Sequence, residues 1–352
     1  MKSPILNYLL IALATVGLLY LAFHGQDLSK AWEAIGSARP LPLLFGILIM
    51  FASHGVRAMR WQIVLRPLKR KTSLWAAFKA TIAGYGMNNL IPRSGEILRP
   101  YMMSRRESIP LAGTLASVVV ERLTDVLALA ALIVFSLLSF ERRVTTVFPM
   151  FSGDAIVILA VILAVLGGFI LMFFSEQRTE QFLKLLTRPL PKGMALKISQ
   201  IGRDFSTGLR GLERSSILPL VIGTAGIWML YGISMYVSLQ AFPERSMAAL
   251  TLRDAFLLLT LSGIAFTIPT PGGTGSYHAL ITTGLSAIFG VAPSTALAYA
   301  VATHALSYIA TTLFGLLFLV REGLSFSSAR QIKTSSEELP SAAYIPQPSD
   351  GG

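Results

Sequence analysis

Two short stretches, Ile91-Pro92-Arg93-Ser94-Gly95 and Ile268-Pro269-Thr270-Pro271-Gly272, decide the fold of this chain. Both follow the pattern Ile-Pro-x-x-Gly, and each interrupts an apolar run that is too short to cross a bilayer comfortably. Proline removes a backbone donor and glycine weakens a helix, so we expect a helix break at each stretch. Broken apolar segments at matching places in two halves of a membrane protein indicate discontinuous helices around a translocation site. A chance recurrence of the pattern is the alternative.

The rest of the chain has the composition of a polytopic membrane protein. Of its 352 residues, 53 % are hydrophobic and only 14 % are charged, which is more apolar surface than one soluble core needs. Apolar segments near or above the length of a membrane span occur at 5–23, 41–61, 111–139, 155–174, 217–242 and 295–320. We therefore predict an all-α membrane protein with about six full crossings and two re-entrant helical hairpins, at about 74–98 and 255–290.

Basic residues predict the orientation. The net charge is +12, and Lys and Arg cluster on both sides of the first hairpin and between 178 and 214. Because such residues are retained in cytoplasmic loops, this side is expected to be cytoplasmic, with both termini inside a bacterial plasma membrane. Residues 41–139 and 217–320 would then be inverted repeats of a single membrane domain, 1–320. A cytoplasmic amphipathic linker over about 175–216 would join them, and 321–352 would be a disordered cytoplasmic tail.

Several function classes find no support in the sequence. The chain has no cysteine, no metal-binding motif and no Gly-x-x-x-x-Gly-Lys loop for ATP, so we predict no metal, no cofactor and no nucleotide-driven step. In a membrane protein, basic residues do not imply nucleic acid. No spacing of a nucleophile and a base supports catalysis, so the chain is predicted not to be an enzyme.

Charged residues inside the membrane are the candidate binding groups. Glu121 lies ten residues into the segment 111–139, roughly 15 Å along a helix, and Arg122 and Asp125 follow it. A charge at that depth costs at least about 2.5–3.5 kcal/mol, so these groups must face the interior and find partners. Arginine binds phosphate oxygens bidentately, and a half-helix starting at Gly95 would add backbone amides. The alternative is that these charges only neutralise one another.

The second stretch is rich in glycine and leads to His278, with His304 in the following crossing. Freed amides at such a turn can bind an anion, and histidines that titrate near neutral pH would allow a proton-coupled step. Packing of both histidines is the alternative. The predicted substrate-binding residues are Asn88, Asn89, Arg93, Glu96, Arg99, Glu121, Arg122, Asp125, His278 and His304. The predicted hinges are Pro92, Gly95, Pro269, Pro271, Gly272, Gly273 and Gly275.

Three motifs in order resemble the lysylphosphatidylglycerol synthase transmembrane-domain family, also called flippase-like or UPF0104 proteins. They are Asn-Asn-Leu-Ile-Pro-Arg-x-Gly-Glu-x-x-Arg ending at Arg99, Glu-Arg-x-x-Asp ending at Asp125, and Pro-x-Pro-Gly-Gly-x-Gly ending at Gly275. The resemblance covers about 41–320 and implies a lipid flippase role. In the branch that moves aminoacylated lipid, the positions of His278 and His304 are typically Glu and Arg. The large synthase domain of that branch is not present after the last apolar segment, so the resemblance implies no synthase activity.

The function predicted from these observations is a flippase for an anionic or phosphate-linked lipid, either passive or coupled to protons or another ion. Two alternatives remain. One is a non-transporting membrane partner of a lipid-modifying enzyme or glycosyltransferase, and the other is an intramembrane enzyme that acts on lipid head groups. The partners expected are the lipid, a lipid-synthesis enzyme or a second copy of the chain.

Overall fold

The computed structural model describes residues 4–149, 161, 168, 175–210 and 214–323, and in these residues the secondary structure is helical, with no strand. The all-α class is therefore confirmed. The predicted crossing at 155–174 falls almost entirely outside the described residues, as does the predicted tail after residue 323.

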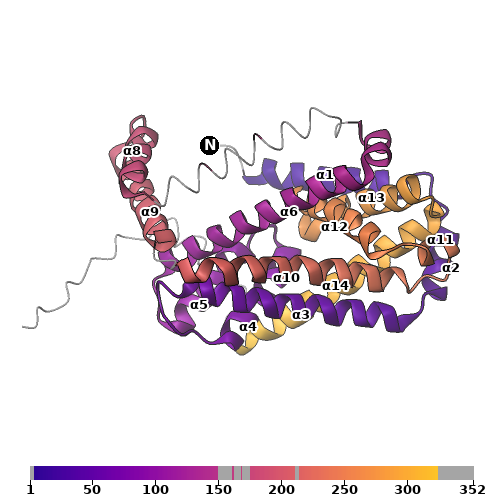
Figure 1. Ribbon diagram of the computed structural model, residues 1–352, viewed down its shortest axis with the longest axis horizontal. Helices are drawn as coiled ribbons and strands as arrows, with labels where there is room; N and C mark the ends of the chain where they lie inside the picture. The colour runs from indigo at the N-terminus through magenta and orange to yellow at the C-terminus, as the bar shows by residue number, and fades with distance from the viewer. Residues whose placement is uncertain (1–3, 150–160, 162–167, 169–174, 211–213, 324–352) are drawn as a thin grey trace, which may run out of the picture.

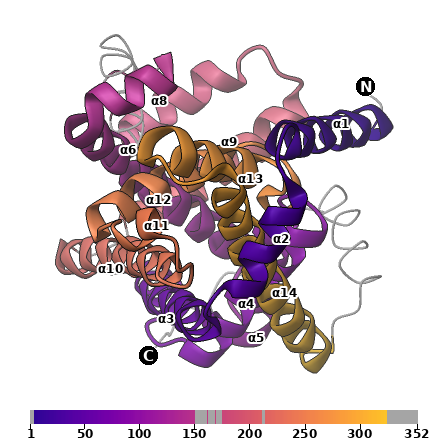
Figure 2. The ribbon, with the colours of Figure 1, turned by 90° about the vertical axis from the view of Figure 1, so that its right-hand side faces the viewer.

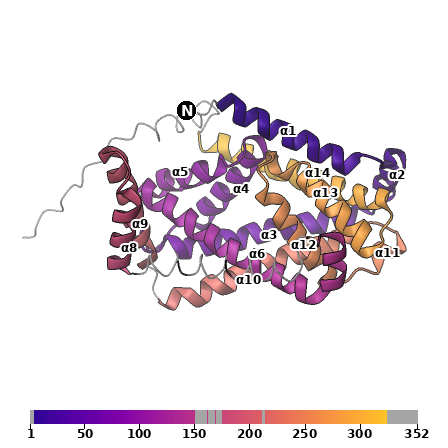
Figure 3. The same cartoon turned by 90° about the horizontal axis from the view of Figure 1, so that it is seen from above.

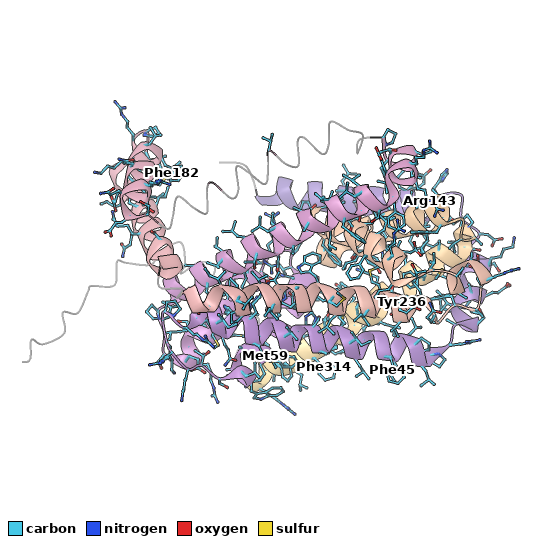
Figure 4. All side chains as sticks on the ribbon, in the orientation of Figure 1. Phe45, Met59, Arg143, Phe182, Tyr236 and Phe314 are labelled. Atoms are coloured by element: carbon cyan, nitrogen blue, oxygen red, sulfur yellow. The ribbon has the colours of Figure 1, made fainter. Side chains whose placement is uncertain are left out.

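Four described helices are long and apolar enough to cross a membrane, and together they confirm a polytopic membrane fold. They are α3 (Pro40–Leu65), α6 (Leu111–Val147), α10 (Arg214–Leu239) and α14 (Pro293–Arg321), each matching a predicted crossing. Their axes run along the long dimension of the molecule (Figure 1). Large apolar side chains cover their outer surface, as Phe45, Met59 and Phe314 show in Figure 4. Such a surface suits contact with lipid tails.

Both predicted helix breaks are present and define two helical hairpins. In the first hairpin, α4 (Leu74–Leu90) and α5 (Gly95–Glu107) are separated at residues 91–94. In the second, α12 (Leu252–Thr267) and α13 (Ser276–Thr283) are separated by a turn that contains the short 3₁₀ helix η2 (Pro271–Gly273). The hairpins enter the molecule from its two opposite ends (Figures 1 and 3).

The two halves run in opposite directions, which is the arrangement that the predicted inverted repeat requires. In the first half, α3 runs toward the end where the first hairpin enters, and α6 returns from it (Figure 1). In the second half, α10 and α14 do the reverse around the second hairpin. Helices α3 and α10 pack closely at Gly46, where an added Cβ atom would clash with the Ser238 hydroxyl and where the Ser234 hydroxyl donates to the Gly46 carbonyl oxygen at 2.7 Å. Small residues at helix contacts are typical of packing within membranes.

Each half has its own apolar core. Trp61, Leu65 and Met103 are fully buried in the first, and Phe242 and Leu258 in the second. Figure 2 looks along the bundle, where α14 of the second half lies beside α4 of the first. These two helices cross at a pair of glycines, Gly86 and Gly315, and a Cβ atom at Gly315 would lie 2.9 Å from the carbonyl oxygen of Ile82. The halves are therefore joined by direct backbone contact.

The remaining helices lie at the edges of the bundle. The apolar helix α1 (Pro4–Phe23) packs on α13, while α2 (Leu28–Ser37) and α11 (Arg245–Ala248) lie at the end where the second hairpin enters. After α13 the chain continues in the π-helix η3 (Gly284–Ile288).

The linker predicted over about 175–216 contains two helices. They are α8 (Glu176–Thr187) and α9 (Lys192–Arg210), which pack on each other and lie across the bundle axis at the end of the first hairpin (Figure 1). Arg203 of α9 pairs with Glu180 of α8 at 3.3 Å. The described linker is therefore a helical pair outside the bundle.

Candidate functional site

The tips of the two hairpins meet at α14. The hydroxyl of Tyr308 donates to the carbonyl oxygen of Asn89 at 2.8 Å, and Nε2 of His304 lies 2.9 Å from the carbonyl oxygen of Gly272. Because these two side chains are four residues apart, they lie on one face of α14. A Cβ atom at Gly272 would be 2.9 Å from Oδ1 of Asn89, so the two breaks also touch each other. One helix face therefore holds both tips.

Asn89 has a structural role in this arrangement. Its amide nitrogen donates to the hydroxyls of Thr311 and Thr312 at 3.0 and 2.9 Å. Asn88 closes the first break, because its Oδ1 accepts from the backbone amide of Gly95 at 2.7 Å. Both residues were predicted to bind substrate, which stays a prediction; in this structure their side chains hold the first hairpin tip.

The amides at the start of α5 are not free in this conformation. Gly95 donates to Asn88, while Glu96 and Ile97 donate to the carbonyl oxygens of Arg93 and Ser94, both at 3.2 Å. The expectation of an open, anion-binding helix start is therefore wrong for this conformation, because the break satisfies its own donors. Arg93 lies at the turn with a left-handed φ of 63°, which is uncommon for a residue other than glycine, and its side chain is exposed.

Beside this tip, four arginines and three carboxylates form one ion-pair network. Glu121 lies between Arg60, whose Nη2 is 3.4 Å away, and Arg99, with which it also pairs. Asp125 lies between Arg57 and Arg60, at 2.6 and 3.0 Å. These five side chains are between 0 % and 12 % exposed, so they are removed from both lipid and water. Pairing is the arrangement that buried charges require, since an unpaired one is strongly destabilising.

Arg57 and Arg60 were not predicted, although a signal for them exists in the sequence. Both lie within the predicted crossing 41–61, three residues apart on the inner side of α3, and are 3 % and 1 % exposed. The argument that singled out Glu121 applies equally to them, because a charge in a spanning helix needs an interior partner. His54, one turn earlier, is also buried, and its ring centroid lies 4.7 Å from that of Tyr85.

The network reaches the surface at one edge. Arg122 pairs with Glu96 at 2.8 Å and lies 3.8 Å from Asp125, and the side chains of Arg122 and Glu96 are 42 % and 31 % exposed. A cavity of about 10 Å³ adjoins this pair, lined by Thr81, Gly84, Tyr85, Asn88, Gly95, Glu96, Arg99 and Arg122. That volume suits about one water molecule and not a lipid head group. A head group would therefore require the first hairpin to move.

The second break has no charged side chain. Gly272, Gly273 and Gly275 adopt φ values of 57°, 76° and 89°, which explains the glycine run, since other residues rarely adopt them. Nδ1 of His278 accepts from the amide of Gly275 at 3.3 Å, and the ring of His278 lies 4.7 Å from that of His304. The two predicted histidines are thus in contact, and both are buried.

Tyrosines pack around this pair, with Tyr277 stacked on His304 at 5.3 Å. Among the described residues, no hydrogen bond or ion pair links either histidine to the charged network, and no group of three metal-ligating side chains is found.

Comparisons with known proteins agree with this architecture. A sequence profile described as "Lysylphosphatidylglycerol synthase TM region" matches residues 5–315. A UPF0104 membrane protein of Methanothermobacter thermautotrophicus is 24 % identical over 84 % of this chain and 89 % of its own length. The UPF0104 membrane protein MJ1595 of Methanocaldococcus jannaschii is 22 % identical over 85 % and 90 %.

A third relative has a different name. Glycosyltransferase AglD of Haloferax volcanii is 23 % identical over 86 % of this chain but only 52 % of its own length. These three relatives are archaeal, so the bacterial plasma membrane stays a prediction.

Proposed function

This chain belongs to the lysylphosphatidylglycerol synthase transmembrane-region family, and from that premise we propose that it moves an anionic or phosphate-linked lipid between the leaflets of its membrane. One observation carries the proposal. Two broken hairpins that enter from opposite ends meet on one face of α14, beside a buried ion-pair network. Inverted repeats with broken helices near the middle of the bundle are typical of transporters in which access alternates.

The charge of the network fits an anion. Arg57, Arg60, Arg99 and Arg122 face Glu96, Glu121 and Asp125, which is 4 − 3, or one positive charge in excess. Each charge at this depth costs about 2.5–3.5 kcal/mol or more on insertion scales, so a purely structural network of seven groups is an expensive way to join helices. A phosphate at the exposed edge would neutralise the excess and accept paired hydrogen bonds from arginine.

In the proposed cycle the chain carries no catalytic residue and uses its hairpins as moving parts. Arg99 and Arg122 would hold the phosphate, while Glu121 and Asp125 keep the inner arginines oriented when the head group is absent. The breaks around Pro92 and Gly272 would act as hinges, and the acyl chains would stay in the bilayer. Transport would be passive or driven by an ion gradient. The predicted orientation, with the basic end and both termini in the cytoplasm, belongs to this proposal.

A second candidate function follows from the relative named as a glycosyltransferase. This chain matches only 52 % of that protein's length. On this view the chain would be a membrane partner that presents a lipid to an enzyme without moving it across the bilayer. The ion-pair network would then bind the head group at one leaflet only.

A translocation assay separates these candidates. The purified chain is reconstituted in liposomes with a trace of fluorescent phosphatidylglycerol, and a membrane-impermeant reductant reports the label that reaches the outer leaflet. We expect faster exchange with the wild type than in protein-free liposomes. Arg99→Gln with Glu121→Gln, which removes both members of a buried pair, should lower the rate at least about tenfold.

Arg203→Gln is the matched control, because it neutralises an arginine of an ion pair on the α8–α9 linker, outside the bundle. It should exchange lipid like the wild type. Exchange at the protein-free rate for every variant, with binding of the lipid retained, would favour the non-transporting partner.

A further inference from the structure

We propose that a phospholipid with an anionic head group enters the network sideways from the bilayer, between α5 and α6, by displacing Glu96 from Arg122. This inference rests on the proposed function for its biological sense, but it concerns binding and the route, which can be measured without transport. Of the seven charged groups, only Glu96 and Arg122 are substantially exposed, while the others are almost completely buried. The network therefore has a single accessible edge within the described part of the chain.

The position of Arg122 on α6 places that edge at the boundary between lipid and protein. Successive residues of an α-helix turn by about 100°, so Leu115, Val119 and Val126 lie within about 60° of Arg122 on one side. These three apolar side chains are 36 %, 49 % and 43 % exposed. On the other side lie buried Val118 and Asp125, about 40° and 60° from Arg122, and Glu121, about 100° from it. Arg122 thus separates an exposed apolar stripe from the buried charges.

An exposed charge on an apolar spanning face needs a partner. Lipid tails cannot solvate a guanidinium, and a carboxylate from the neighbouring helix supplies the counter-charge in this conformation. The phosphodiester of a lipid carries the same single negative charge as that carboxylate and also offers two oxygens that accept paired hydrogen bonds from arginine. The acyl chains of the lipid would lie along the stripe of Leu115, Val119 and Val126. One molecule would thereby satisfy both the charge and the apolar face.

Next to the Glu96–Arg122 pair, the buried Arg99 guanidinium can donate a further hydrogen bond. Arg99 lines the small cavity behind Glu96 and Arg122, is 4 % exposed, and its Nε has no hydrogen-bond partner. A buried donor without a partner is costly, so an arriving phosphate oxygen would gain a strong bond there. We infer that the head group passes from Arg122 to Arg99 as the first hairpin moves away from α6.

The absence of cysteine from the chain makes a direct test simple. Val126→Cys and Leu127→Cys are labelled with a small fluorophore in phosphatidylcholine nanodiscs. Both side chains are exposed, at 43 % and 38 %, and are neighbours in depth, but Leu127 points about 140° away from Arg122. The probes are phosphatidylglycerol and diacylglycerol, each with a nitroxide quencher on the acyl chain. At position 126, phosphatidylglycerol should quench about threefold more strongly than diacylglycerol, and at position 127 the two should be equal.

Variants of Glu96 and Arg122 identify the side chain that recognises the lipid phosphate. In the Val126→Cys background, Glu96→Gln should increase the preference for phosphatidylglycerol, because a competing carboxylate is gone. Arg122→Gln should abolish it, Arg122→Lys should leave part of it, and Arg203→Gln should not change it. Excess inorganic phosphate should leave the preference in place, because the acyl chains also hold the lipid.

Each contrary result has a definite meaning. Equal quenching by the two probes at position 126, or an unchanged preference in Arg122→Gln, would overturn the lateral route even if translocation is observed. Loss of the preference with inorganic phosphate would assign the edge to a free anion and overturn it too. A clear preference at position 126 together with no translocation would keep the lipid site and refute the transport proposal.

Discussion

The first hairpin, α4 with α5, and the second, α12 with α13, share a shape but differ in chemistry. The two hairpins enter from opposite ends, and each breaks at an Ile-Pro-x-x-Gly stretch and bonds to the same face of α14. The first presents Glu96 and Arg99 to a buried network, whereas the second offers two packed histidines and a glycine turn. We infer that the shared shape provides the movement and that the first hairpin provides the recognition of charge.

The largest difference between the hairpins should appear when one buried partner is removed. Glu121→Leu leaves Arg99 without its carboxylate and weakens the pairing of Arg60, so the free energy of unfolding should fall by about 3–5 kcal/mol. His278→Phe in the second hairpin removes one weak hydrogen bond and should cost only about 1 kcal/mol. Thermal unfolding in detergent measures both. Equal losses for the two variants would mean that the network is not the more critical region.

The crossing of α4 and α14 should be the next most sensitive point. Gly315→Val places side-chain atoms against the backbone of Ile82 and Gly86, with a Cβ atom 2.9 and 3.0 Å from them, and should cost about 1–3 kcal/mol. Gly55→Ala is the control, since nothing lies within 4 Å of its added Cβ atom. Chemical unfolding measures the free energy of unfolding of both variants. An unchanged free energy for Gly315→Val would show that the halves are not joined at this crossing.

Removing single tethers should free the two tips separately. Tyr308→Phe loses the bond to Asn89, and His304→Phe loses the bond to Gly272, each worth about 0.5–1.5 kcal/mol. Amide hydrogen exchange should rise around residues 86–95 in the first variant and around 268–277 in the second. A rise at both tips in both variants would show that the hairpins open as one unit.

The smallest effect concerns the pH dependence of stability at Glu107, the last residue of α5, which lies outside the spanning segments. Burial alone would raise the pKa of Glu107, but the Lys69 ammonium at 2.7 Å and the Ser73 amide at 2.9 Å outweigh it and hold the pKa below its usual 4.5. A lowered folded pKa contributes stability above pH 4.5 that is lost as the pH falls through the folded value.

Wild-type protein should therefore lose more stability than Glu107→Gln between pH 6 and pH 3, by about 0.2–1 kcal/mol. An equal loss of the free energy of unfolding in the two proteins between pH 6 and pH 3 would exclude the contribution of this ion pair.

Much of the fold could be predicted because its signals are local. Proline and glycine mark the breaks, and basic residues at one end fix the relative orientation of the halves. The partners of Glu121 and Asp125 could not be assigned in this way, because Arg57 and Arg60 come from another helix and pairing depends on how α3 and α6 pack. Asn88 and Asn89 show the converse limit. Their amides suit a ligand or a helix break equally well, and only the three-dimensional contacts show that Asn88 bonds across the break and Asn89 bonds to α14.

The most direct test of the central claim compares the two hairpins in one translocation assay. Fluorescent phosphatidylglycerol exchange is measured for the wild type, for Arg99→Gln with Glu121→Gln, and for His278→Phe with His304→Phe, all confirmed as folded by size-exclusion chromatography. The account predicts an exchange rate near the protein-free background for the first pair and a rate within about threefold of wild type for the second. Retained exchange without the charged pair, or its loss only without the histidines, would contradict the account.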